Sequence, residues 1–168
     1  ITPEEIGKEN FQNDNQNEVQ VYAYADIAED YYERPDYLTS ILKSEEAKLE
    51  GSPFGKALDD YQNNKISSAL NELDKSKNSI ESNEIFLKAN ILFELKRYIE
   101  ATKEFEKLTK DELLPLYEDA QWYLLLCYTA ALPKSSSQYE KLLSQLLAQT
   151  DGFYFNKVKQ LSDTVKKQ

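Results

Sequence analysis

Apolar side chains recur at helical spacing in the segment that begins at residue 52. Ser52 followed by Pro53 is typical of a helix start, because serine caps the first turn and proline suits its first position. Four apolar side chains then fall on one face: Phe54, Ala57, Leu58 and Tyr61. After a turn at Asn63 and Asn64, a second apolar face follows: Ile66, Ala69, Leu70 and Leu73. The pattern predicts two antiparallel helices joined by a short turn.

The same pattern returns in residues 86–108. One predicted helix carries Phe86, Ala89, Leu92 and Phe93 on a single face, and the next carries Tyr98, Ala101, Phe105 and Leu108. Lys96 and Arg97 form the predicted turn between them. When the two pairs are aligned, Ala57 matches Ala89 and Ala69 matches Ala101, with a spacing of 32 residues in both cases. A helix pair repeated at such a period is the mark of a solenoid.

A third helix pair is predicted after the connector LTKDELLPLYED. Its first helix is AQWYLLLCYTAAL, residues 120–132, and its second is QYEKLLSQLLAQ, which follows a predicted capping cluster of serines at 135–137. Leu125 matches Ala89 at a distance of 36 residues. A last amphipathic helix is predicted over residues 153–167, with these side chains on one face: Tyr154, Val158, Leu161 and Val165.

These units resemble tetratricopeptide repeats. The second is the most similar, with Ala89 at the small position of its first helix and Ala101 at that of its second. The third keeps Trp122 and Tyr128, but Leu125 is larger than the expected glycine or alanine, and Tyr139 stands where a small alanine is expected. The resemblance implies an all-α fold: a right-handed superhelical array of antiparallel helix pairs, with about three repeats, a C-terminal capping helix and an N-terminal helical extension.

Three regions follow from these patterns. Residues 1–18 are polar and aperiodic and are predicted to be a flexible leader. Residues 19–50 form an acidic, tyrosine-rich extension, and residues 51–168 form the repeat domain. In the extension, residues 19–25 alternate as in a short strand, but a helix over 22–33 is favoured, and 36–50 suits a short helix or an ordered connector. The extension is expected either to cap the first repeat or to bind a partner.

Charge and residue types exclude several kinds of function. The net charge of −10 argues against nucleic-acid binding, and residues 1–50 hold thirteen Asp and Glu against four Lys and Arg. Without histidine and with one cysteine, Cys127, the chain lacks the residues for Ser-His-Asp catalysis or a Cys/His zinc site, so we expect no cofactor and no metal. A carboxylate-based hydrolase is the remaining enzyme alternative. Its candidate side chains are Glu29, Asp30, Glu33, Asp59, Asp60, Glu118 and Asp119. Solvated helix faces explain these acids better, and a non-enzyme is predicted.

The apolar run at residues 120–132 is too short to span a membrane, which takes about 20 residues. It is predicted to be core, whereas Trp122 can face either the core or a groove. Because the chain does not begin with methionine, we expect it to be trimmed from a longer product. The order YYERPDYL, repeat pair, AxWYLxLxY is similar to tetratricopeptide domains of Bacteroidetes that follow a single transmembrane anchor. That similarity implies a missing N-terminal anchor and a place in the cell envelope, on the periplasmic side of the inner membrane.

In such arrays the first helix of each pair lines the concave surface, which implies a partner-binding groove. The expected groove residues are Leu58, Tyr61, Gln62, Phe86, Asn90, Phe93, Glu94, Trp122, Leu126 and Thr129. Because the set contains no lysine or arginine, a clamp for a C-terminal carboxylate is not expected. A peptide with apolar side chains and a basic one at a single point fits better.

The first functional hypothesis is therefore a protein-interaction module that binds a protein or peptide partner. The alternative is a structural spacer or assembly subunit whose groove is filled by its own N-terminal segment. The sequence leaves the oligomeric state open.

Overall fold

The chain is all-α. The computed structural model describes residues 23–38, 40, 49–75 and 81–168, and these residues form helices joined by turns, with no strand among them. They fall into two compact units. The central unit spans residues 32–127, and the terminal unit combines the N-terminal residues up to Tyr31 with residues 128–168. The division lies within the third predicted repeat.

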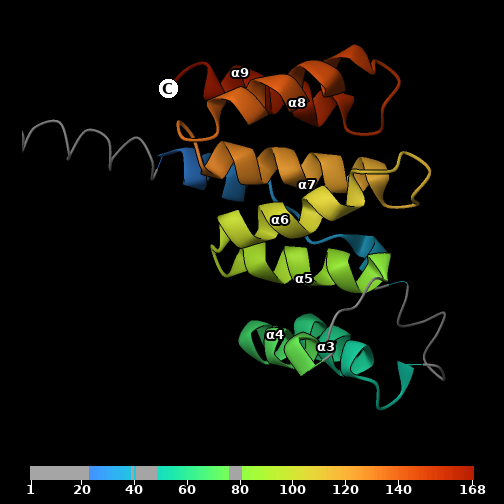
Figure 1. Cartoon of the computed structure of the whole chain (residues 1–168). Coiled ribbons are helices and arrows are strands. Elements are labelled where there is room, and N and C mark those ends of the chain that lie inside the picture. The colour runs from blue at the N-terminus through green and yellow to red at the C-terminus, as the bar shows by residue number, and fades with distance from the viewer. Residues whose placement is uncertain (1–22, 39, 41–48, 76–80) are drawn as a thin grey trace, which may run out of the picture. The chain divides into compact units, whose positions relative to one another are not determined.

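The central unit contains two successive helix pairs. The first is α3 (Pro53–Gln62) with α4 (Ile66–Lys75), and the second is α5 (Ser82–Glu94) with α6 (Tyr98–Leu108). Within each pair the helices pack side by side, and α5 also packs against α4 and α3 (Figure 1). Both helix pairs were predicted from the spacing of their apolar residues, and both are confirmed as helices.

Helix α3 begins as its sequence indicates. The hydroxyl of Ser52 accepts a hydrogen bond from the Gly55 amide at 2.9 Å, and Pro53 occupies the first turn. Gly55 is required by its surroundings, because a Cβ there would lie 2.1 Å from the Leu49 carbonyl oxygen. The chain that enters α3 therefore crosses close to the first turn of the helix.

The two pairs turn in the same way. Asn64 follows α3 and Lys96 follows α5, and both adopt a left-handed backbone, with φ of 63° and 59°. In each turn, the amide of the residue after the left-handed one donates to a carbonyl five residues earlier in the chain. The Lys65 amide donates to the Asp60 carbonyl at 2.8 Å, and the Arg97 amide donates to the Leu92 carbonyl at 2.9 Å. This is the Schellman ending of a helix, repeated with the 32-residue spacing of the sequence.

Small and aromatic residues share the interior of the central unit. Ala57, Ala69, Ala89 and Ala101 are each fully buried, so the four aligned alanines lie where neighbouring helices approach closely. The ring of Tyr123 on α7 (Tyr117–Ala130) stacks on Phe105 of α6, with centroids 5.7 Å apart, and meets Phe86 of α5 edge to face at 5.7 Å. These contacts place α7 against α5 and α6.

The predicted core assignment of the run at residues 120–132 is confirmed for its first eight residues. Residues 120–127 are all buried, and Trp122 is only 1% exposed, as expected for a side chain that packs in the core. Burial raises the pKa of the Cys127 thiol well above its ordinary value. Among the described residues, no helix is both long and apolar enough to cross a membrane.

The terminal unit is held together by its last two helices. Helix α8 (Ser136–Ala148) packs against α9 (Phe155–Val165) (Figure 1). Val158 and Leu161 of α9 are fully buried. The amphipathic pattern of residues 153–167 therefore predicted a real helix. Residues 23–30 are also helical, and the following Tyr31 hydroxyl lies 2.8 Å from Thr164 Oγ1. The helix favoured over 22–33 is shorter than predicted, because it ends at residue 30; Pro35 disfavours helical backbone only at Arg34.

One prediction about a connection turns out differently. The serine cluster does not cap α8 through its side chains: Ser135 donates to the Tyr128 carbonyl at 2.5 Å, and Ser136 donates to the Pro133 carbonyl. The hydroxyls satisfy carbonyls of the preceding turn rather than the amides of α8. The predicted leader, residues 1–18, and much of the predicted 36–50 connector lie outside the described residues.

Candidate peptide-binding site

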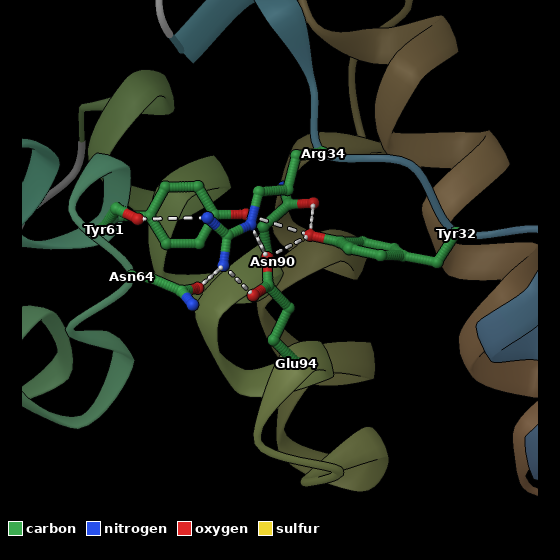
Figure 2. Close-up of polar contacts among 6 residues, drawn as sticks. All are labelled: Tyr32, Arg34, Tyr61, Asn64, Asn90 and Glu94. Atoms are coloured by element: carbon green, nitrogen blue, oxygen red, sulfur yellow. Dashed lines mark hydrogen bonds and ion pairs between the residues drawn. The ribbon is translucent and has the colours of Figure 1, made fainter.

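The segment at residues 32–35 is not helical and lies against the first helices of the repeats in the central unit. It crosses from the short helix at 23–30 to a helical stretch at 36–38. Two of its side chains, Tyr32 and Arg34, reach α3 and α5 (Figure 2). Together with four partners they form a cluster that we call the tyrosine-arginine site: Tyr32, Arg34, Tyr61, Asn64, Asn90 and Glu94.

Tyr32 fills the apolar part of this site. Its ring stacks on Phe93, with centroids 4.6 Å apart and an interplanar angle of 18°, and meets Tyr123 edge to face at 5.7 Å. Its hydroxyl lies 3.1 Å from Asn90 Oδ1 and 3.0 Å from Glu94 Oε1, either of which can accept its single proton. Tyrosine therefore matches the site at both ends, with an apolar body and a polar tip.

Glu94 is the hub of the polar contacts. Its Oε1 accepts from the hydroxyl of Tyr61 at 2.5 Å and from Nε of Arg34 at 2.8 Å, while its Oε2 accepts from Nη2 of Arg34 at 2.6 Å. The guanidinium and the carboxylate thus meet in a two-pronged pair, the geometry in which arginine binds carboxylates most strongly. The Glu94 side chain is 15% exposed and that of Arg34 37%, so the pair lies at the rim of the site.

Arg34 also contacts the end of α3. Its Nη1 donates to the Tyr61 carbonyl at 3.2 Å and its Nη2 to Asn64 Oδ1 at 2.7 Å, while its guanidinium carbon lies 4.6 Å from the centre of the Tyr61 ring. The last carbonyls of a helix carry a partial negative charge, and Tyr61 and Glu94 stand in the last turns of α3 and α5. The cation is therefore bound where two helix ends and a carboxylate supply negative potential.

Two further groups hold the segment in place. The Tyr123 hydroxyl donates to the backbone carbonyl of Glu33 at 2.8 Å, and the Tyr37 hydroxyl donates to Asn83 Oδ1 at 2.9 Å. Asn90 is itself oriented, because its amide nitrogen donates to the Phe86 carbonyl at 2.8 Å and leaves its oxygen toward Tyr32. The segment contacts α3, α5 and α7, which are the first helices of the three predicted pairs.

Burial and charge keep the two phenols of the site neutral and the guanidinium charged. Burial raises the pKa of Tyr32 above its ordinary value of 10.0, and the nearby Tyr61 and Glu94 raise it further. The pKa of Tyr61 is also raised, mainly by burial and next by the negative charge of Glu94. The hydrogen bond to Glu94 raises the pKa of Arg34. Both phenols therefore act as proton donors to acceptors in the site across the neutral pH range.

The ten expected groove residues are mostly buried in this arrangement. Eight are buried, Glu94 is partly covered and Gln62 is exposed. The structure brings Tyr61, Asn90, Phe93 and Glu94 together around Tyr32. Leu58 and Phe86 lie in the interior of the central unit, as do Trp122 and Leu126, whereas Thr129 belongs to the terminal unit.

Four residues whose side chains form or support the tyrosine-arginine site were not among the predicted groove residues: Tyr32, Arg34, Asn64 and Tyr123. The sequence held one signal for Arg34, which is the only basic residue between Lys8 and Lys43 in an otherwise acidic region. It held no signal that pairs Arg34 with Glu94, because 60 residues separate them.

Two of the acids considered for catalysis illustrate their surroundings. Asp60 accepts from the Ser68 hydroxyl at 2.6 Å and lies 3.7 Å from Lys65, and Glu118 is exposed in the first turn of α7. In the described part of the chain, no group of three or more Asp, Glu or Cys side chains is arranged to hold a metal ion.

Comparison with known proteins assigns no family. No protein-family model, curated protein or solved structure gives a significant match to the chain. What can be said of function therefore rests on the sequence pattern and on the geometry of the tyrosine-arginine site.

Proposed function

We propose that this protein is a non-catalytic protein-interaction module with tetratricopeptide-like repeats. In this proposal the face built by α3, α5 and α7 binds an extended peptide segment, and the chain's own residues 32–35 occupy it intramolecularly. One observation carries the proposal: a non-helical segment inserts Tyr32 and Arg34 into the predicted groove residues Tyr61, Asn90 and Glu94. Recognition of an extended segment by a few anchoring side chains is how many peptide-binding proteins work.

Three observations support the repeat architecture in this proposal. The aligned alanines are all buried, the left-handed turn residues Asn64 and Lys96 are 32 residues apart, and Tyr61 is 32 residues from Phe93, its aligned position. The placement in the cell envelope, behind an N-terminal anchor, rests only on the sequence resemblance and is part of the proposal.

A capture experiment tests the proposal. In the double variant Tyr32→Ala/Arg34→Ala the segment loses both anchors, so the face becomes accessible to a partner. We expect this variant to capture a partner from extracts of its source, to lose that partner when Glu94→Gln is added, and to keep it when Glu100→Gln is added instead. Glu100 is a matched control, because it forms the same two-pronged pair with Arg97 on the exposed surface of α6. An identical set of partners in all variants would contradict the proposal.

A structural role is the second candidate, and the partly buried Tyr32 ring, which stacks on Phe93, favours it. If the segment is a permanent cap, Tyr32→Ala/Arg34→Ala will lower the free energy of unfolding and no variant will gain a partner. Wild type, the double variant and its two combinations with Glu94→Gln and Glu100→Gln therefore separate the two candidates. A loss of stability alone supports the structural role, and capture that depends on Glu94 supports the binding role.

A further inference from the structure

We infer that the tyrosine-arginine site recognises a partner protein through an extended Tyr-x-Arg segment, and that residues 32–34 of this chain are an intramolecular competitor for that partner. The inference rests on the proposed function and deepens it by naming the chemistry of the ligand. The site already holds such a segment, so the atoms that would bind the partner are the ones that bind Tyr32 and Arg34.

The pairing of one aromatic and one cationic side chain follows from the shape of the site. Phe93 provides a flat apolar surface for a ring, and Asn90 accepts a hydrogen bond at the ring's far end, so a phenol fits better than a phenyl group. Glu94 and the carbonyl of Tyr61 face a planar group with several donors. A lysine could not make the two parallel hydrogen bonds that Arg34 makes to the carboxylate.

The spacing of the two anchors also follows from the contacts. Between Tyr32 and Arg34, residue 33 is bound through its backbone carbonyl, which accepts from Tyr123, and it is exposed to solvent. The recognised pattern is thus two side chains separated by one residue whose backbone is held.

The site also has features that suit exchange of the occupant. The Arg34 guanidinium lies at the rim of the site, and its side chain is 37% exposed. A partner's arginine can therefore approach the Glu94 carboxylate from solvent. Tyrosine and arginine are the side chains that dominate binding energies at protein interfaces. A tethered segment acts at an effective concentration of about millimolar, so it opposes weak ligands and yields to tight or multivalent ones.

Peptide binding tests the inference directly. The probe is a fluorescent synthetic peptide with the sequence of residues 30–37, DYYERPDY. We expect it to bind the full-length Tyr32→Ala/Arg34→Ala variant, and to bind wild type about tenfold more weakly or worse because the tethered segment competes. A peptide with lysine in place of its arginine is expected to bind the variant about tenfold more weakly, since one of the two charge-assisted hydrogen bonds is lost.

Receptor variants locate the binding. Added to the double variant, Glu94→Gln is expected to weaken peptide binding about tenfold or more, whereas Glu100→Gln leaves it unchanged. Circular dichroism checks that each protein is folded. Arg34→Ala alone is the second receptor, because it empties the rim of the site and leaves the Tyr32 ring on Phe93.

Each other outcome overturns the inference in a recognisable way. If a folded receptor binds no peptide, or binds it equally well with Glu94→Gln, the ligand chemistry is wrong. Capture of a partner that still depends on Glu94 would then leave the proposed function intact, and loss of both would end it. If wild type forms a dimer that Glu94→Gln abolishes, the occupant is a second copy of this chain and not a different partner.

Discussion

Glu94 is the residue on which the site depends. A carboxylate in the last turn of α5 faces the negative end of its own helix, an unfavourable position when nothing compensates it. The guanidinium of Arg34 and the hydroxyl of Tyr61 provide that compensation. Removing one partner therefore leaves a partly buried charge with fewer hydrogen bonds, which costs more than a surface contact would.

We expect Glu94→Gln to lower the free energy of unfolding by about 1–3 kcal/mol, because the amide keeps the shape but loses the charge-assisted hydrogen bonds. Urea denaturation of wild type, Glu94→Gln, Arg34→Ala and the combined Glu94→Gln/Arg34→Ala protein gives the coupling energy of the Arg34–Glu94 pair. We expect a coupling of roughly 1 kcal/mol or more, as in networks that share partners.

The control for this cycle is the pair of Arg97 and Glu100, which has similar distances but exposed side chains on both sides. Its coupling should be clearly smaller than that of the Arg34–Glu94 pair, because solvent screens a pair whose two side chains are both exposed. Equal coupling for the two pairs would show that the setting of Glu94 adds nothing to its ion pair.

Tyr32 and Tyr61 make stability depend on alkaline pH. Their folded-state pKa values are raised above the ordinary 10.0, so the folded protein keeps protons that the unfolded chain releases above that pH. Their contribution is complete below pH 10.0 and is lost as pH rises beyond it, by about 1.4 kcal/mol per pH unit for each group. Urea titrations at several alkaline pH values measure this slope.

Tyr32→Phe is the control for the alkaline slope. It keeps the ring on Phe93 but removes one raised pKa, so the slope should become shallower while the stability at neutral pH falls only by the value of the hydroxyl contacts. An unchanged slope would mean that Tyr32 ionises in the folded protein as freely as in the unfolded one.

At the scale of the elements, the two helix pairs share one ending. Asn64 and Lys96 both have positive φ, and both endings use the same pair of backbone hydrogen bonds. Their side chains have different uses, because that of Asn64 accepts from Arg34 and so connects the turn to the site. Lys96 is therefore the position at which the strain of the turn can be measured without disturbing the site.

We expect Lys96→Gly to be more stable than Lys96→Ala by about 0.5–1 kcal/mol. Alanine keeps the cost of a Cβ in the left-handed region, and glycine removes it at some expense in the entropy of the unfolded chain. Thermal or urea unfolding of the two variants checks the sign.

The matched pair of variants at Lys103, an exposed residue inside α6, should show the reverse order. There the backbone is helical, and glycine is less stable than alanine by about 1 kcal/mol. The same order at both positions would rule out strain as the explanation for Lys96.

At the scale of the whole molecule, the N-terminal region serves two units. Residues 23–31 belong to the terminal unit, where Ile27 and Ala28 are buried and Tyr31 contacts Thr164. Residues 32–38 belong to the central unit, where they carry the site's two anchors. The short sequence YYER thus divides its two tyrosines between the two units.

Deletion of residues 1–35 should therefore lower stability strongly, by several kcal/mol, because it removes buried side chains from one unit and the occupant of the site from the other. Deletion of residues 1–18, the predicted leader, should change stability little. Calorimetry of the two truncated proteins measures the difference. Comparable stability of both would mean that neither unit depends on the extension.

Much of the fold was predictable because its signals are local. The Ser52-Pro53 start, the turn at Asn63 and Asn64, and the apolar faces of α3 to α6 each depend on residues within one or two turns of each other. The apolar run around Trp122 likewise predicts that its side chain is buried, as it is. Where the prediction failed, at the serines before α8, two competing sets of backbone groups were in reach, and the hydroxyls bound the carbonyls.

The sequence by itself determined that the chain is helical, where its first pair begins, where the first two pairs turn, and that an acid and an amide stand on the face of a first helix. Only the tertiary structure decided what those groups bind. Tyr32 and Glu94 are 62 residues apart, and Arg34 and Glu94 are 60 apart, so no local pattern connects them. Helical periodicity records which side of a helix is buried, whereas the identity of the covering segment depends on packing between distant parts of the chain.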